Sequence, residues 1–321
     1  MSGGTSGDRA GGRSRPRPRV ANAPVSFGVD EIIVDDAWMP RPDDVLDLIA
    51  ELGFEGTELG PPGYLGDGET VRARLAGRRL ELVGSFLPLH LSRGERMADD
   101  LQWLRQALAL LRDATPEGSR PLAILSDHFD EPDRMALAGR IADHPEAWLA
   151  PARFRVLVDN LHRAAEVCRA AGFEPVVHPH AGTYIESRDE TCRVLDAIDA
   201  SLVGWCLDTG HARFGGADPV ELVRRYHELV RHVHLKDCRT AVLDGIARDG
   251  LGMEAALVRG AFVELGEGDA GVAAVIAELR AFDYRGWLVV EQDRFLFASD
   301  TLDTLRAAQG RNRAFLRSFE L

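Results

Sequence analysis

Leu-Asp-Thr-Gly-His at residues 207–211 contains the end of an apolar run, which stops abruptly at side chains able to bind a metal ion. The pattern recurs in His-Val-His-Leu-Lys-Asp at 232–237 and Val-Val-Glu-Gln-Asp at 289–293, and Val-Val-His-Pro-His at 176–180 precedes them. Imidazole and carboxylate groups together suit Mn²⁺, Zn²⁺, Co²⁺ or Fe²⁺ better than Ca²⁺. The four segments therefore predict a site for a divalent cation where several strands end.

Apolar runs and helical patterns alternate along most of the chain. The strand candidates are residues 23–29, 56–59, 80–87, 121–125, 175–178, 203–207, 232–235 and 287–291. Apolar residues at three- and four-residue intervals predict helices over residues 42–52, 101–111, 154–171 and 272–282. Such alternation implies parallel strands with right-handed crossovers, and eight units close into a single (β/α)₈ TIM barrel. An open doubly wound sheet is the competing fold, but its glycine-rich fingerprint is missing after the first strand candidate.

Length and composition fit one globular domain. A chain of 321 residues suits one barrel of about 250 residues with long loops. We predict a disordered basic leader over residues 1–20, with an electrostatic tether as the alternative, and a catalytic barrel over residues 21–321. The four cysteines show no paired spacing, which is typical of reduced thiols in a cytoplasmic protein. The net charge of −13 argues against nucleic acid as a partner, and no long apolar run predicts a membrane span.

Two connections are longer than a barrel needs. Residues 127–151 follow the fourth strand candidate, and residues 238–269 follow the seventh. Both leave the carboxyl ends of their strands, which is the face where barrel enzymes build their active sites. We expect them to act as lids or as walls for a substrate.

Histidines two residues apart on a strand face the same side. His178 and His180 form one such pair, and His234 belongs to another. A lone histidine at a strand end is usually structural, but several that converge with carboxylates favour metal binding. Asp208 can reach the ion while His211 faces the substrate, and the alternative is that Asp208 caps the next helix.

Several stretches together carry a resemblance to a known family. The first part of the resemblance lies in residues 21–29, 53–61 and 63–65. The rest lies in residues 178–183, 207–211, 232–237 and 286–293, which follow in the order found in the family. They resemble the xylose-isomerase-like TIM-barrel superfamily, which holds sugar isomerases and epimerases, endonuclease IV proteins and inosose dehydratases. The likeness spans about residues 21 to 293 and is greatest to the inosose dehydratases.

The resemblance implies one divalent ion held by Asp208, His234 and Glu291. The remaining ligand position, on the fifth strand, is usually acidic in the superfamily but falls on His178 in this chain. We expect His178 to ligate, with His180 or Glu186 as the alternatives. Mn²⁺ is the expected ion, and Co²⁺, Zn²⁺, Fe²⁺ and Mg²⁺ are the alternatives.

Four further residues are candidates for catalysis. Glu58 ends the second strand, where the resemblance implies a base or a substrate contact, with a salt bridge to a helix as the alternative. His180, His211 and Lys236 can act as acids, and Lys236 can also neutralise an enolate. For Lys236 the alternative is an ion pair with a neighbouring aspartate.

Substrate contacts are expected from residues near the same strand ends. His90 and His128 follow the third and fourth strand candidates and either line the mouth or are solvated loop histidines. Glu186 is a further candidate. Tyr64, with Trp38 and Phe86, can supply an apolar wall for the carbons of a polyol, although they can equally be core aromatics.

The preferred function is a metal-dependent dehydratase that acts on an inosose-like keto-polyol through an enediolate intermediate. A keto-sugar isomerase or epimerase on the same scaffold is the alternative enzyme. A non-catalytic barrel that binds polyols is the alternative of another class. The expected partner is a small-molecule substrate, with neither nucleic acid nor membrane, and related barrels are often homo-oligomers.

Overall fold

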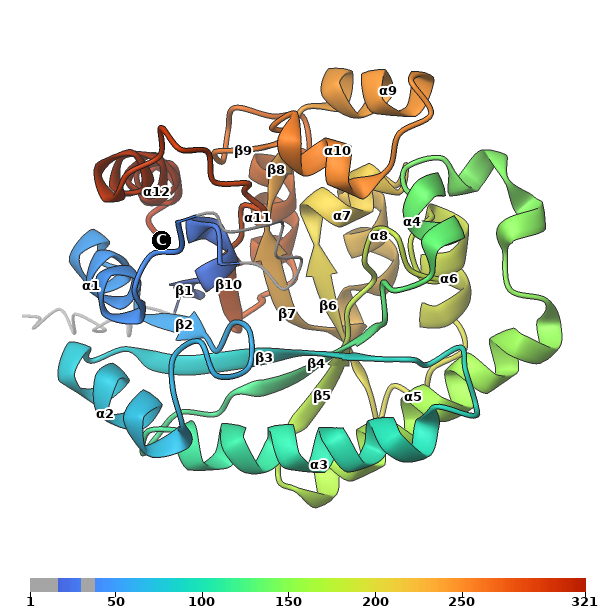
Figure 1. Cartoon of the computed structure of the whole chain (residues 1–321), viewed down its shortest axis with the longest axis horizontal. Coiled ribbons are helices and arrows are strands. Elements are labelled where there is room, and N and C mark those ends of the chain that lie inside the picture. Colours follow the sequence, from blue (N-terminus) through green and yellow to red (C-terminus); the bar gives the residue numbers. More distant parts are fainter. Residues whose placement is uncertain (1–16, 30–37) are drawn as a thin grey trace, which may run out of the picture.

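A closed barrel of eight parallel strands forms the centre of the computed structural model, which describes residues 17–29 and 38–321 (Figure 1). The order around the barrel is β1-β10-β7-β6-β5-β4-β3-β2. The strands are β1 (Arg19–Asn22), β2 (Gly56–Glu58), β3 (Glu81–Leu89), β4 (Leu122–Asp127), β5 (Glu174–Val177), β6 (Gly204–Asp208), β7 (Val230–Leu235) and β10 (Trp287–Val290). The predicted fold class is confirmed.

Helices surround the barrel on its outer side (Figure 1). They are α1 (Pro42–Leu52), α2 (Gly68–Arg78), α3 (Met97–Ala114), α5 (Pro151–Ala170), α6 (Arg188–Leu195), α7 (Thr209–Phe214), α8 (Pro219–Tyr226), α11 (Val272–Ala281) and α12 (Leu302–Arg317). The four helices predicted from periodicity correspond to α1, α3, α5 and α11. Helix α2 was not predicted because Val71 and Leu75 are its only large apolar buried residues, too few to give a helical apolar pattern.

The start of the barrel differs from the prediction. The first strand is Arg19–Asn22, and Pro24–Phe27 within the predicted strand forms a 3₁₀ turn that ends at Gly28 with φ 77°. The prediction of a strand over 23–29 is therefore wrong: Pro24 cannot donate to a sheet, and Gly28 turns the chain into the left-handed region. Because β1 begins at Arg19, the barrel also reaches into the predicted leader, whose residues 1–16 lie outside the described residues.

The barrel interior changes from apolar to polar along the strands. Two small buried clusters consist mainly of residues on barrel strands, so they fill the inside of the barrel: one includes Ala21, Val83 and Val289, and the other includes Ile124, Val176 and Cys206. Two residues further along their strands come the polar groups of the mouth, such as Asp208 after Cys206. Strand alternation thus places the candidate site directly above the apolar interior.

The two long connections meet above the carboxyl ends of the strands. The first contains α4 (Pro132–Leu137) and the 3₁₀ turns η2 (Ile141–Asp143) and η3 (Pro145–Ala147). The second contains a small antiparallel pair, β8 (Asp237–Cys238) with β9 (Phe262–Val263), and the helices α9 (Thr240–Arg248) and α10 (Met253–Val258).

Contact between these connections is direct. Arg140 donates to the carbonyl of Gly250 at 3.2 Å, and a side chain at Gly252 would overlap the backbone of Met135. They therefore form one roof on the active face, in agreement with the expected walls (Figure 1). Within the described part of the chain, every helix is too short or too polar to cross a bilayer.

Candidate active site

A pocket opens at the carboxyl ends of the strands and encloses about 650 Å³, counting the part that opens to solvent. Its polar lining comes from β2, β7 and the segments that follow β5, β6 and β10. It includes these predicted residues: Glu58, His178, His180, His211, His234, Lys236 and Glu291. Side chains far apart in the sequence are thus brought together, as the strand ends predict.

Asp208 has two roles, one for each carboxylate oxygen. Its Oδ1 accepts a hydrogen bond from the backbone N–H of His211 at 2.8 Å and thereby caps helix α7. Its Oδ2 faces the site, 3.6 Å from Nε2 of His178 and 3.7 Å from Nδ1 of His234. The ligand hypothesis and the capping alternative are therefore compatible.

His234 stands at the centre of the cluster. Its Nδ1 is 3.1 Å from Oε2 of Glu291 and 3.3 Å from Nε2 of His178. One ligand atom each of Asp208, His234 and Glu291 lie within 4.8 Å of one another, and all three residues are buried. Burial lowers the pKa of His178, so this imidazole is neutral and able to ligate.

Glu58 is held by two histidines. Its Oε1 is 2.8 Å from Nε2 of His232 and 2.9 Å from Nε2 of His234. Burial alone raises the pKa of Glu58, but the charge of His234 and both hydrogen bonds outweigh it and hold the pKa well below its usual value. The carboxylate therefore stays ionised and fixes the ring of His234 with Nδ1 towards the site. The alternative of a salt bridge to a neighbouring helix is therefore wrong, because both partners of Glu58 lie on β7.

Lys236 lies between three carboxylates. Its Nζ is 3.1 Å from Asp208 Oδ2, 3.1 Å from Glu291 Oε2 and 2.7 Å from Asp293 Oδ1. Burial lowers the pKa of Lys236, but the three carboxylates outweigh burial and raise the pKa well above its usual value. The ammonium group therefore compensates the negative charge of these three carboxylates at the floor of the pocket. Gly210 permits this, because a Cβ there would lie 2.5 Å from the lysine stem.

His180 and His211 contact each other at the wall of the pocket, with ring centroids 3.8 Å apart and ring planes tilted by 41°. Nδ1 of His180 lies 2.8 Å from the carbonyl of Ala181, so Nδ1 carries the proton and Nε2 keeps its lone pair. Nε2 of His211 accepts from Lys236 Nζ at 2.9 Å. Burial lowers the pKa of His180 to about 3 and that of His211 well below its usual value. Both rings are neutral at pH 7.

The donor groups fit a divalent ion. Oδ2 of Asp208 is buried and accepts no hydrogen bond from the described residues, although Lys236 is within ion-pair distance. Two carboxylates and two imidazoles converge on one spot, which is the donor chemistry of Mn²⁺, Fe²⁺, Co²⁺ and Zn²⁺ sites. Asp208, His234 and Glu291, with His178 beside them, are the residues that can hold such an ion.

Two predicted substrate residues lie outside the pocket lining. Nδ1 of His90 is 2.9 Å from Asp100 Oδ1, and its Nε2 is 3.2 Å from Asp130 Oδ2. His128 stacks on the ring of His90, with centroids 4.3 Å apart. One ligand atom each of His90, His128 and Asp130 lie within 4.8 Å of one another. The structure therefore places both histidines in a separate cluster with Asp130, at the start of the connection that follows β4.

Tyr64, Trp38 and Glu186 are also absent from the described pocket lining. The hydroxyl of Tyr64 donates to the carbonyl of Pro40 at 2.8 Å, and Trp38 is exposed. The carboxylate of Glu186 accepts the backbone N–H groups of Gly139 and Gly182. Glu186 therefore joins the connections after β4 and β5, and the alternative that it folds back to ligate the ion is wrong.

The pH dependence of stability provides a test of this role of Glu186. Burial raises the pKa of Glu186 to about 7 in the folded protein. In the unfolded chain its pKa has the ordinary glutamate value of about 4.3. Between these values the folded state binds more protons, so the contribution of Glu186 is complete below pH 4.3 and is lost as pH rises through 7. We expect Glu186→Gln to remove up to about 4 kcal/mol of this pH-dependent change in unfolding free energy.

Urea denaturation at several pH values between 4.5 and 8 measures this difference. Glu267→Gln, in an exposed part of the second long connection, is the matched control and should follow the parent protein. Parallel pH profiles for the parent protein and Glu186→Gln would contradict the assignment.

Some site residues were not predicted. Phe129 and Met253 line the pocket, Asp293 holds Lys236, and His232 holds Glu58. Asp293 had a detectable signal, since it lies two residues beyond Glu291. For Lys236, which was predicted, the sequence has a further signal: it is the only lysine in a chain with 38 Lys and Arg residues. Met253 had none, because only the folded roof brings α10 over the pocket.

Comparison with known proteins identifies the family. Residues 46–318 match the family model of the xylose isomerase-like TIM barrel. The chain belongs to this family. It is 35% identical over 281 residues to an inosose dehydratase of Geobacillus kaustophilus (strain HTA426), which covers 86% of this chain and 87% of that protein.

Solved structures share the fold. The IolI protein with a bound zinc atom matches with a TM-score of 0.67 at 12% identity, over 93% of this chain and 97% of its own. A D-allulose 3-epimerase from Methylomonas sp., in complex with D-allulose, matches with a TM-score of 0.65 at 14% identity, over 95% of this chain and 98% of its own. At these identities the similarity supports the barrel and no particular reaction.

Proposed function

We propose that the protein is a metal-dependent dehydratase that acts on an inosose-like cyclic keto-polyol. The observation that carries the proposal is the convergence of Asp208, His234 and Glu291, two of which line the pocket at the carboxyl ends of the strands. The 35% identity to an inosose dehydratase over most of both chains supports the reaction. The zinc-bound neighbour supports a divalent ion, and Mn²⁺ is our choice among the candidates.

The pocket suits an uncharged ring. Lys236 is the only Lys or Arg among its described lining residues, and three carboxylates already surround the ammonium group. No cation therefore remains there for a phosphate or carboxylate group of a substrate. Phe86 and Phe129 stand on one side, and Pro24 and Pro61 line the pocket as well. These apolar groups can contact the C–H bonds of a polyol while its oxygens face the polar floor.

Asp208, His234 and Glu291, with His178, would hold the ion. When bound, a divalent ion draws electrons from the ketone oxygen and makes the neighbouring C–H bond more acidic. The positive charge of Lys236 lies against the same floor and stabilises the negative charge that develops on the substrate oxygen.

His180 is suited to move the proton. Its neutral ring keeps the lone pair of Nε2 free, because Nδ1–H donates to the carbonyl of Ala181. We assign this nitrogen to remove the proton next to the ketone. Once protonated, the ring is the general acid of the second step. It can therefore return the same proton to the β-hydroxyl, which leaves as water, so the reaction needs no net proton.

Incubation of the Mn²⁺-loaded protein with 2-keto-myo-inositol tests the function. We expect an ultraviolet absorbance from the dehydrated product, with at least about a hundredfold loss in His180→Gln, the contribution typical of a general acid–base group. Cys192→Ser, a buried change in α6 (Arg188–Leu195), is the control that should retain the rate.

The other outcomes favour the alternatives. Deuterium exchange from solvent into a ketose without new absorbance would assign the protein to isomerisation or epimerisation. Polyol binding with neither exchange nor absorbance would instead indicate a non-catalytic barrel.

A further inference from the structure

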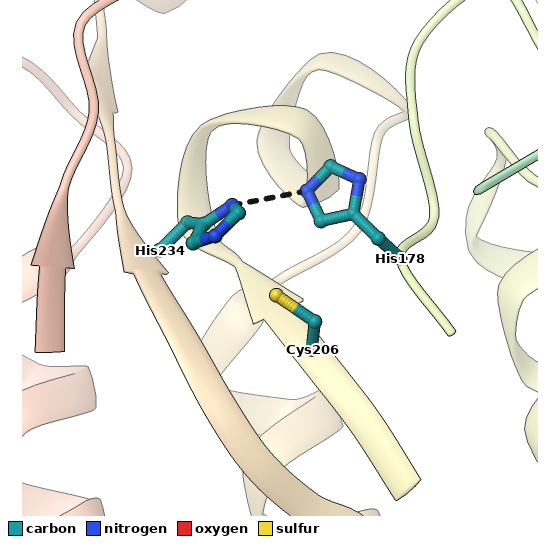
Figure 2. Close-up of side chains that lie close together, drawn as sticks. All are labelled: His178, Cys206 and His234. Carbon is teal, nitrogen blue, oxygen red and sulfur yellow. Dashed lines mark hydrogen bonds between the residues drawn. The ribbon is translucent and has the colours of Figure 1, made fainter. Parts of the chain in front are cut away.

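A buried thiol lies next to the two histidines of the ion site. Cys206 is on β6, two residues before Asp208, and its side chain therefore points to the same interior face. Figure 2 shows Cys206 beside the facing rings of His178 and His234. One ligand atom of each of these three residues lies within 4.8 Å of the other two, and all three are buried.

The two imidazoles are spaced as ligands of one ion. Nε2 of His178 and Nδ1 of His234 are 3.3 Å apart. A tetrahedral ion with bonds of ~2.05 Å to nitrogen separates two such ligands by about 3.3–3.4 Å. The hydrogen bond from Nε2 of His234 to Glu58 directs Nδ1 towards His178, and Nδ1 of His178 has no hydrogen-bond partner among the described residues. A cation between the rings would replace the proton on Nδ1 of His234 and bind one nitrogen of each ring.

We propose that His178, Cys206 and His234 form an inner site for a thiophilic divalent ion such as Zn²⁺. The inner site shares His234 with the outer set of Asp208, His234 and Glu291, and it also uses His178, which lies beside that set. Since one ring nitrogen cannot bind two ions, occupation of the inner site excludes the catalytic arrangement. The chain therefore has two alternative positions for an ion, an inner one with a sulfur ligand and an outer one with two carboxylates.

Ligand chemistry separates the ions between these positions. Thiolate and imidazole favour Zn²⁺ and Co²⁺, whereas carboxylate ligands suit Mn²⁺ and Mg²⁺. The interior around Cys206, with Ile124 and Val176, is apolar and leaves the sulfur without competition from water. On binding, the thiol proton and water from the ion leave to solvent through the pocket mouth.

The consequence is inhibition of the proposed dehydratase by zinc. N, O and S ligands bind Zn²⁺ more tightly than Mn²⁺, so Zn²⁺ should displace Mn²⁺ and stop turnover. Only this consequence rests on the proposed function. The inner site itself rests on the positions of its three ligands.

Titration of the metal-free full chain with Co²⁺ tests the inner site directly. We expect a thiolate-to-cobalt charge-transfer band in the near ultraviolet for the parent protein and for Cys192→Ser, and none for Cys206→Ser. Competition with a chromophoric chelator should show a zinc affinity at least about tenfold lower in Cys206→Ser. Even the loss of a group that only hydrogen-bonds to a metal ligand lowers metal affinity by about tenfold to a hundredfold. Mn²⁺ affinity, followed by electron paramagnetic resonance, should fall less than zinc affinity.

The parent spectrum decides the proposal even if Cys206→Ser does not fold. Absence of the band in the parent protein, or its persistence in a folded Cys206→Ser or Cys206→Ala, would overturn the inner site. The two proposals fail separately. A band without dehydration of the keto-polyol retains the inner site and rejects the function, whereas dehydration without a band does the reverse.

Discussion

Glu291→Gln is expected to lower kcat/KM by at least about a thousandfold, because the divalent ion contributes several kcal/mol to the transition state. Glu291 lies within 4.8 Å of the ligand atoms of Asp208 and His234 and has nearly the same shape as glutamine. The amide keeps the volume but loses the negative charge that attracts the ion. Rates at increasing Mn²⁺ and direct measurement of bound Mn²⁺ should therefore show loss of affinity together with loss of rate.

The fold should survive this change. Barrel stability resides in packed layers such as Ile124 and Val176, which lie below the mouth. Circular dichroism and urea denaturation check the fold, and Glu267→Gln controls for the loss of one carboxylate in an exposed loop on the same face. Full turnover of Glu291→Gln under limiting metal would show that Glu291 is not a ligand.

Lys236→Met should destabilise the protein by about 3–5 kcal/mol in the absence of metal, which is the usual cost of breaking a buried ion pair. The change leaves the carboxylates of Asp208, Glu291 and Asp293 buried next to one another without their shared cation. Urea denaturation of the metal-free proteins measures the loss. The double variant Lys236→Met with Asp293→Asn removes one of these charges and should recover part of the stability.

Addition of Mn²⁺ should reduce the deficit of Lys236→Met. A divalent ion on Asp208 and Glu291 replaces the missing positive charge, and binding to the folded state alone raises stability. A loss that is the same with and without Mn²⁺ would contradict the electrostatic role of Lys236. Lys236→Arg extends the test, because its guanidinium group is wider than an ammonium group. It must pass Gly210, which the lysine stem approaches so closely that a Cβ built on Gly210 would lie 2.5 Å from it.

The barrel could be predicted from local patterns, and its failures have physical causes. Seven of the eight strand candidates overlap observed strands, because strands buried on both faces read as short apolar runs. The first candidate failed since Ala21–Asn22 continues into a proline turn of similar hydrophobicity. Hydrophobicity alone does not separate the two, whereas Pro24 and Gly28 do.

The site was predictable only where alternation along a strand determines the direction of a side chain. Asp208, His234, Lys236 and Glu291 met this condition, and the structure brings them together. The partners of His90 could not be inferred from spacing, because they lie on α3 and on the connection after β4. His90 pairs with Asp100, ten residues further along the chain.

The sequence by itself determined the barrel, the family and the group of polar side chains at the strand ends, because periodicity and alternation are local properties of the chain. Tertiary structure alone decided which of those groups pair: that two histidines hold Glu58, that three carboxylates share Lys236 and that Cys206 lies beside His178 and His234. These contacts join strands that are far apart in sequence. Their distances depend on how the closed barrel sets the stagger of its strands, which no single segment encodes.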